Sequence, residues 1–158
     1  MLFSSRHDAI RPVSAAKYIY GQNGEIRGYG GPSVRGTVEK IPAGQWFSYM
    51  PAADHPEYPS ASAAACAAHA EVMRHYWKTD EFGWTVARPK GSSIIEPGAT
   101  PNEDFSHTFE TWTQFETECG MSRLYGGVHF RDSIEVVREV AHEVGKNAYD
   151  YVQAHINP

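Results

Sequence analysis

Large aliphatic side chains are scarce in this chain, and the scarcity limits the folds open to it. Leu, Ile, Val and Phe together provide only 28 of the 158 residues, a share at which many chains cannot bury a core. The formal net charge is only −5 and aromatic residues reach 13%, so disorder is not favoured. We therefore expect a folded domain built on Ala, Tyr, Trp and Phe. Because such a core is thin, we also expect partner protein chains, in a homo-oligomer or a larger complex.

Length and composition exclude several classes of protein. Residues 1–158 fit one domain, and the mild acidity without a basic stripe argues against nucleic acid as a partner. No run of about 18 apolar residues is present, so no transmembrane segment is expected. Residues 1–3 are too short for the apolar part of a signal peptide, and no cellular location is indicated. Cys66 and Cys119 have neither metal-type spacing nor a disulfide framework, so two reduced, mostly buried thiols are expected.

The hydrophobic periodicity predicts a mostly α-helical chain. Ala63 to Ala70 combines high helix propensity with small side chains, which permits close approach of a neighbouring helix. The last predicted helix repeats apolar residues at helical spacing, typical of a core or a partner-helix face. Helices are expected over residues 3–20 (with a turn or extended segment after Pro12), from Ser60 or Ser62 to about Trp77, over 105–119 with an end at Gly120, and from Asp132 onward.

Long segments rich in Gly and Pro separate these helices. They cover residues 28–59 and 82–101, and long loops in small domains are often functional. The Asn23-Gly24 dipeptide suits a tight turn, which predicts a short β-hairpin between Tyr18 and Tyr29. Two further strand-like pieces cover 36–41 and 46–50.

Three short segments carry residues suited to binding an oxyanion. Arginine donates two parallel hydrogen bonds to such an anion, and a helix N-terminus offers N–H groups and a favourable dipole. The segments are Arg11-Pro12, Glu57-Tyr58-Pro59-Ser60-Ala61-Ser62 before the alanine-rich helix, and Ser122-Arg123 six residues before His129. Taken singly, Arg11 could be a helix-end ion pair, Ser60 a helix cap and His129 a half-buried structural histidine.

Taken together, the three segments resemble the oxyanion site of the vanadium-dependent haloperoxidases and their relatives in the type 2 phosphatidic acid phosphatase superfamily. The resemblance implies that Arg11, Ser60, Ala61 and Arg123 bind vanadate or phosphate. It also implies that His129 bonds the vanadium, or is phosphorylated in the phosphatases. The fold implied is a partial haloperoxidase/acid-phosphatase-type helical bundle.

Two positions depart from the family pattern. Ser62 stands where the family has its acid–base histidine, and Ser4 stands where it has a lysine. A serine hydroxyl does not transfer a proton near neutral pH, so no intact catalytic set is expected. His7 falls on the same helical face as Arg11 and could supply a cation, although an exposed histidine without function is the simpler interpretation.

The resemblance covers roughly residues 6–150 and corresponds to the C-terminal part of the family, with the preceding helices absent. We therefore expect a divergent haloperoxidase-like protein that is catalytically impaired and acts as a subunit or scaffold. The alternative is an active vanadium-dependent haloperoxidase or a related acid phosphatase. The other histidines, among them His69, His75, His142 and His155, are expected at the surface or in structural roles, and Glu116 and Glu118 on a solvated face.

Overall fold

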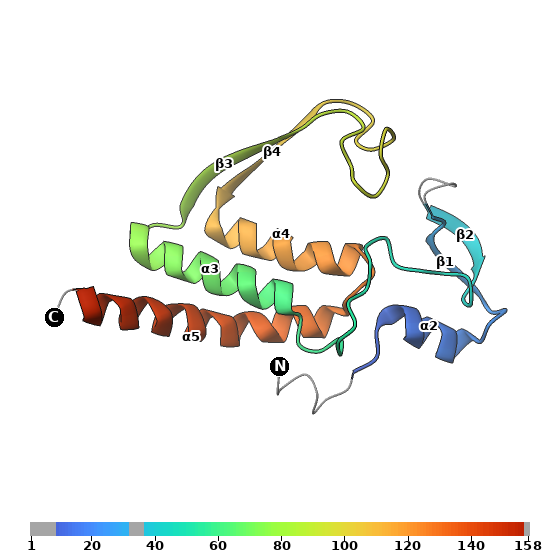
Figure 1. The fold of residues 1–158 in the computed structure, drawn as a ribbon, viewed down its shortest axis with the longest axis horizontal. Helices are drawn as coiled ribbons and strands as arrows, with labels where there is room; N and C mark the ends of the chain where they lie inside the picture. The colour runs from blue at the N-terminus through green and yellow to red at the C-terminus, as the bar shows by residue number, and fades with distance from the viewer. Residues whose placement is uncertain (1–8, 32–36, 157–158) are drawn as a thin grey trace.

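Three helices lie side by side and form the largest unit of the fold (Figure 1). The computed structural model of the chain describes residues 9–31 and 37–156. The helix α3 (Ala61–Trp77) packs against both α4 (Trp112–Tyr125) and α5 (Arg131–Ile156). The mostly helical class is thereby confirmed. The alanine-rich helix ends at the expected residue, and α5 begins one residue before the expected start.

Small residues account for the close packing of these helices. A Cβ atom added to Gly120 would lie 2.9 Å from Cγ2 of Ile134, and one added to Gly145 would lie 2.5 Å from the carbonyl oxygen of Ala68. Gly120 therefore lies inside α4 and permits contact with α5, which corrects its expected role as the helix end. The buried face of α3 consists of alanines: Ala63, Ala67 and Ala70. A core of this kind needs few large aliphatic side chains.

The first described helix, α2, covers Pro12–Tyr20. Pro12 occupies its first turn, where a missing N–H costs nothing, so the expected turn after Pro12 is wrong. The helix includes residues 18–20, so the predicted hairpin around Asn23-Gly24 is also wrong. Instead β1 (Glu25–Tyr29) pairs antiparallel with β2 (Thr37–Pro42). The expected strand at 36–41 matches β2, the segment 46–50 is irregular, and residues 3–8 of the expected first helix lie outside the described residues.

A second antiparallel pair forms a long arm that arches over α4 (Figure 1). It consists of β3 (Glu81–Arg88) and β4 (Phe105–Thr111), so the predicted loop at 82–101 and the predicted helix from 105 are both partly wrong. Large and small side chains alternate through most of β4, a period of two that is typical of a strand. Pairing with β3 allows the segment to form that strand. Trp84 and Phe109 lie opposite each other with ring centroids 5.7 Å apart.

A disulfide and a group of buried ion pairs correct what was expected of the two cysteines and of Glu116. Cys66 and Cys119 form a disulfide that joins α3 to α4, because their Cα atoms lie 6.4 Å apart, within the range that a disulfide spans. Glu116 is 2% exposed rather than solvated. Its carboxylate lies 3.1 Å from Arg74 of α3, 2.6 Å from Arg138 of α5 and 3.0 Å from His142 of α5.

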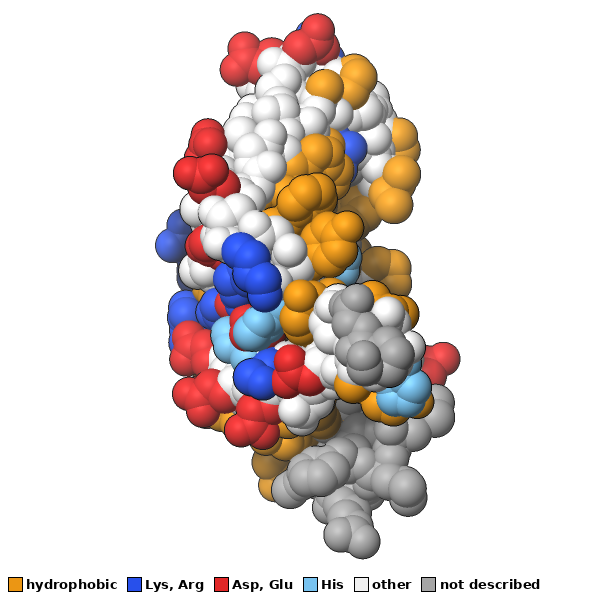
Figure 2. All heavy atoms as spheres, turned by 90° about the vertical axis from the view of Figure 1, so that its left-hand side faces the viewer, with side chains coloured by type: hydrophobic (Ala, Val, Ile, Leu, Met, Phe, Trp, Pro, Cys, Tyr) orange, Lys and Arg blue, Asp and Glu red, His pale blue; other side chains and the backbone are white. Residues whose placement is uncertain are grey.

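Apolar side chains also remain on the surface. Figure 2 shows a band of them on the face that bears the end of α3 and the arm, where Trp77, Trp84 and Phe105 are each about half exposed. On α5, Ile134, Val137 and Ala141 are buried, whereas a second row on the same helix is exposed: Val136, Val140, Val144 and Tyr151. Among the described helices, none is both long and apolar enough to cross a membrane.

Candidate oxyanion site

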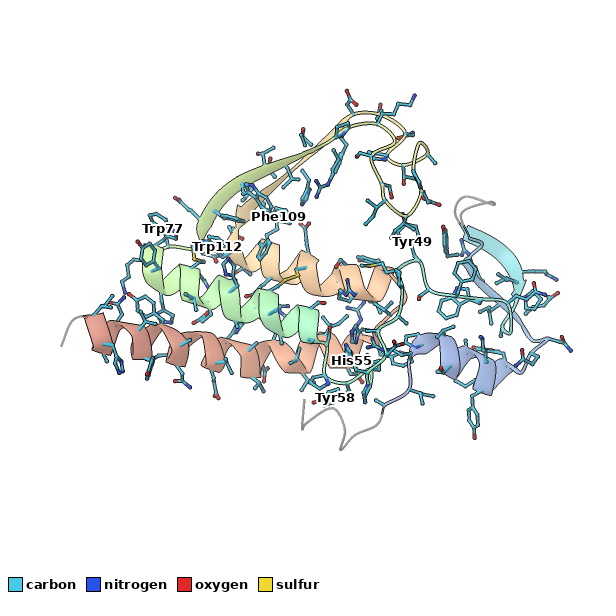
Figure 3. All side chains as sticks on the ribbon, in the orientation of Figure 1. Tyr49, His55, Tyr58, Trp77, Phe109 and Trp112 are labelled. Carbon is cyan, nitrogen blue, oxygen red and sulfur yellow. A yellow bond between two sulfur atoms is a disulfide. The ribbon has the colours of Figure 1, made fainter. Side chains whose placement is uncertain are left out.

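Four elements bring the predicted site residues to one end of the helical bundle. Arg11 immediately precedes α2, and Ser60 is the N-cap residue of α3. Arg123 lies in the last turn of α4, and His129 lies in the short link between α4 and α5. The loop that leads into α3, with His55 and Tyr58 labelled in Figure 3, lies beside this end of the bundle. The link is folded back by hydrogen bonds from the N–H groups of Val128 and His129 to the carbonyl oxygen of Arg123.

Arg11 is 9% exposed and lies between the link and the loop. Its Nη1 atom donates to the carbonyl oxygen of Val128 at 2.9 Å and lies 3.1 Å from Nε2 of His129. Its Nε and Nη2 atoms donate to the carbonyl oxygen of His55 at 3.2 and 3.0 Å. Burial lowers the pKa of Arg11, which Glu57 opposes and Arg123 reinforces, but an arginine stays protonated in such a setting.

His129 is buried and contacts a carboxylate on its other side. Its Nδ1 atom lies 3.0 Å from Oε1 of Glu57, which is itself 3% exposed. Burial lowers the pKa of His129 most; Glu57 raises it, and the charges of Arg11 and Arg123 lower it further. The net shift is downward, so the imidazole is neutral at pH 7 and carries a lone pair on one nitrogen.

Among the buried polar atoms that have no hydrogen-bond partner in the described part of the chain, two belong to predicted site residues. They are Oγ of Ser60, in a fully buried residue, and Nε of Arg123. The Ser60 hydroxyl does not cap its own helix, although its backbone N–H donates to the carbonyl oxygen of Ser133 at 3.1 Å. Buried polar groups are rarely left unpaired, so both atoms remain able to bond a polar ligand at this end of the bundle.

The donor set fits an oxyanion such as vanadate. Two guanidinium groups, a hydroxyl and a helix N-terminus donate hydrogen bonds or favour negative charge, and neutral His129 offers one nitrogen as a metal ligand. No cluster of three or more His, Cys, Asp or Glu side chains arranged for a cation occurs in the described part of the chain.

The remaining predicted positions are less central. Ala61 is exposed and Ser62 half-buried in the first turn of α3. Ser4 and His7 lie outside the described residues. His75 and His142 both lie against carboxylates, as structural histidines do.

Sequence reasoning missed two residues of the site, His55 and Glu57. Glu57 lies three residues before Ser60, within the segment singled out for other reasons. The signal that could have identified Glu57 was the presence of an acidic residue so close to an expected anion site. Its role could not be read because its contact with His129 spans 72 positions.

Comparisons with known proteins show the family to which the chain belongs. Residues 5–158 match the family described as "VCPO second helical-bundle domain". Two solved structures, of the holo and apo forms of a bacterial vanadium-dependent chloroperoxidase, are 42% identical in sequence and superpose with TM-scores of 0.94 and 0.93. Each match covers 99% of this chain but 33% of the other, so the chain spans about a third of the length of those proteins. No functionally curated protein matches it.

Proposed function

Because the chain belongs to the family of VCPO second helical-bundle domains, we propose that its oxyanion site binds vanadate. The observation that carries the proposal is the pair of buried, unpartnered atoms, Oγ of Ser60 and Nε of Arg123. Arg11 and Arg123 would neutralise the anion, Ser60 and the start of α3 would donate hydrogen bonds, and Nε2 of His129 would be the ligand to the metal. Bound vanadate would supply the centre at which peroxide and halide react. Phosphate, with similar oxygen geometry, is the competing ligand.

Calorimetric titration of the purified chain with orthovanadate tests this proposal. We expect saturable binding that weakens at least tenfold in Arg123→Gln and stays unchanged in Arg88→Gln, an exposed arginine on the arm. Ser60→Ala makes a sharper test, because it removes an unsatisfied buried hydroxyl. It should leave the anion-free protein as stable as before, or more stable, while weakening vanadate binding. Equal affinity in all four proteins, or no saturable binding to the parent chain, contradicts the proposal.

Two hypotheses about catalysis follow from the same site. The first is that the chain is impaired in halide oxidation and serves as a subunit or scaffold, since Ser62 offers no proton donor near neutral pH. The second is an active haloperoxidase, which the 42% identity to a vanadium-dependent chloroperoxidase favours. The second hypothesis requires bound vanadate and the first does not, so turnover in the presence of vanadate separates them.

We also propose that the exposed apolar row of α5 is covered by further protein in the working assembly. Val140, Val144 and Tyr151 are each more than half exposed, which is unusual for a row of large apolar side chains on one helix face. The match covers 33% of the similar chloroperoxidase, so most of that protein lies outside the matched part. We therefore expect a partner chain, or a second copy of this chain, to cover the exposed row of α5.

A further inference from the structure

We propose that Glu57 is the positioning residue that fixes His129 in its Nδ1–H tautomer and thereby directs an unprotonated Nε2 towards the oxyanion. The inference deepens the proposed vanadate site, on which its functional meaning rests. It assigns a role to a residue for which the sequence alone indicated none.

The contacts of one carboxylate oxygen support the assignment. Oε1 of Glu57 lies 3.0 Å from Nδ1 of His129 and accepts the N–H of Phe130 at 2.8 Å. The hydroxyl of Ser133, in the first turn of α5, donates to the same oxygen. The backbone N–H of Phe130 can only donate, so Oε1 is an acceptor, and the nitrogen of His129 that faces it must carry the proton.

The opposite edge of the imidazole gives the same answer independently. Nη1 of Arg11 lies 3.1 Å from Nε2 of His129. A guanidinium group only donates hydrogen bonds, so Nε2 must present its lone pair. The two neighbours therefore specify one tautomer from opposite sides of the ring.

Glu57 is also held rigidly enough to act in this way. It is 3% exposed, and its backbone N–H donates to the carbonyl oxygen of Ala9 at 2.9 Å, next to the segment that carries Arg11. Three residues later the chain reaches Ser60. Its backbone is thus anchored beside the approach to α2, and its carboxylate cannot turn away without losing the hydrogen bonds to Phe130 and Ser133.

A purely structural role for Glu57 has to be distinguished from positioning, because its carboxylate also holds Phe130 and Ser133. The chain offers a matched control. Ser133→Ala removes one donor to the same oxygen but leaves Nδ1 of His129 in contact with it. If Glu57 had a structural role alone, Glu57→Gln and Ser133→Ala would both lower the stability, and neither would change which nitrogen of His129 carries the proton.

The experiment records ¹⁵N spectra of histidine-labelled protein, residues 1–158, without anion, with the His129 signals identified by their loss in His129→Gln. We expect Nδ1 to carry the proton in the parent chain and in Ser133→Ala. In Glu57→Gln, whose amide can present either N–H or oxygen, we expect a mixture of tautomers, and vanadate affinity about tenfold weaker. Glu110→Gln, at an exposed position of β4, should match the parent chain.

Two results overturn the proposal. One is a parent chain in which Nε2 carries the proton, a result that needs only His129→Gln to assign the signals. The other is Glu57→Gln that keeps the Nδ1–H tautomer and the parent affinity. If vanadate fails to bind while the tautomer behaves as expected, the vanadate site is refuted and the positioning role stands.

Discussion

Nη1 of Arg11 lies 3.1 Å from Nε2 of His129, although 118 positions separate the two residues in sequence. The guanidinium therefore occupies the direction in which that nitrogen would bind a metal. An oxyanion that reaches His129 must exchange this hydrogen bond for bonds of its own to Arg11. The site is consequently arranged around the imidazole before any anion arrives, and Arg11 has two sets of partners.

We expect Arg11→Lys to weaken vanadate binding about tenfold. Lysine keeps the positive charge but lacks the planar fork that contacts Val128, His55 and His129 together. Calorimetric titration measures the change, and Arg88→Lys on the exposed arm is the control. Unchanged affinity in Arg11→Lys would show that charge alone, and not the shape of the guanidinium, matters at this position.

Halide oxidation by the unmodified chain should be absent or slow. A positioned acid–base group contributes roughly 10²–10⁴ in rate, and Ser62 supplies none near neutral pH. The assay adds vanadate, peroxide and bromide and compares the chain with Ser62→His. Activity that appears only in Ser62→His supports a site that still binds the anion but lacks the acid–base group. Rapid turnover by the unmodified chain establishes the active haloperoxidase instead.

Stability should fall as the pH drops below about 6.5. Burial lowers the pKa of His129 from the ordinary value of 6.5, against the raising effect of Glu57. The unfolded chain therefore takes up this proton first, and the stabilisation present above pH 6.5 is lost as the pH falls through the lower folded value. Urea unfolding between pH 8 and 5 measures the slope. His129→Gln should flatten it, and an equally steep slope in the variant would assign the effect to other groups.

Reduction of the Cys66–Cys119 disulfide should destabilise the chain by about 4 kcal/mol, from the loop-closure entropy of its 53-residue separation. The bond joins α3 just after Ser62 to α4 just before Arg123, so vanadate affinity should fall as well. Denaturant unfolding with and without dithiothreitol measures the first effect. The double variant Cys66→Ser, Cys119→Ser should behave like the reduced protein and show no response to the reductant.

Val140→Asp should abolish association without unfolding the chain. Val140 is 58% exposed, and substitutions at such positions usually change stability by less than about 0.5 kcal/mol. Analytical ultracentrifugation should show self-association or a partner complex for the parent chain and for Glu139→Gln on the same helix. A parent chain that remains a stable monomer at all concentrations tested, and that forms no partner complex, rules out the interface.

The sequence alone predicted α3 and α5, because the signals for these two helices lie within their own residues. The alanines from Ala63 to Ala70 have high helix propensity wherever they are placed, and α5 repeats its apolar residues at helical spacing. The segment before α4 was ambiguous for a physical reason. Phe109, Trp112 and Phe115 fit a helical spacing, while Phe105, His107 and Phe109 fit a strand, and only pairing with residues 81–88 decides between the two.

The site residues also fall into two groups, those that short sequence segments indicate and those that depend on distant contacts. Arg11, Ser60, Arg123 and His129 could be named because they stand in recognisable short segments. Glu57 and His55 could not, since their contacts with His129 and Arg11 depend on how the loop before α3 folds back. The disulfide was missed because two cysteines 53 positions apart carry no spacing signal, and only the packing of α3 on α4 brings them together.

The buried carboxylate of Glu116 restricts how this fold can change over evolutionary time. Its partners Arg74 and Arg138 come from two other helices, and losing either one leaves an under-compensated charge in the interior, which is far more costly than losing a surface pair. Replacing all three residues by apolar ones of similar volume carries no such cost. In divergent sequences of this fold, the three positions should therefore vary together or remain fixed together, and single exchanges among them should be rare.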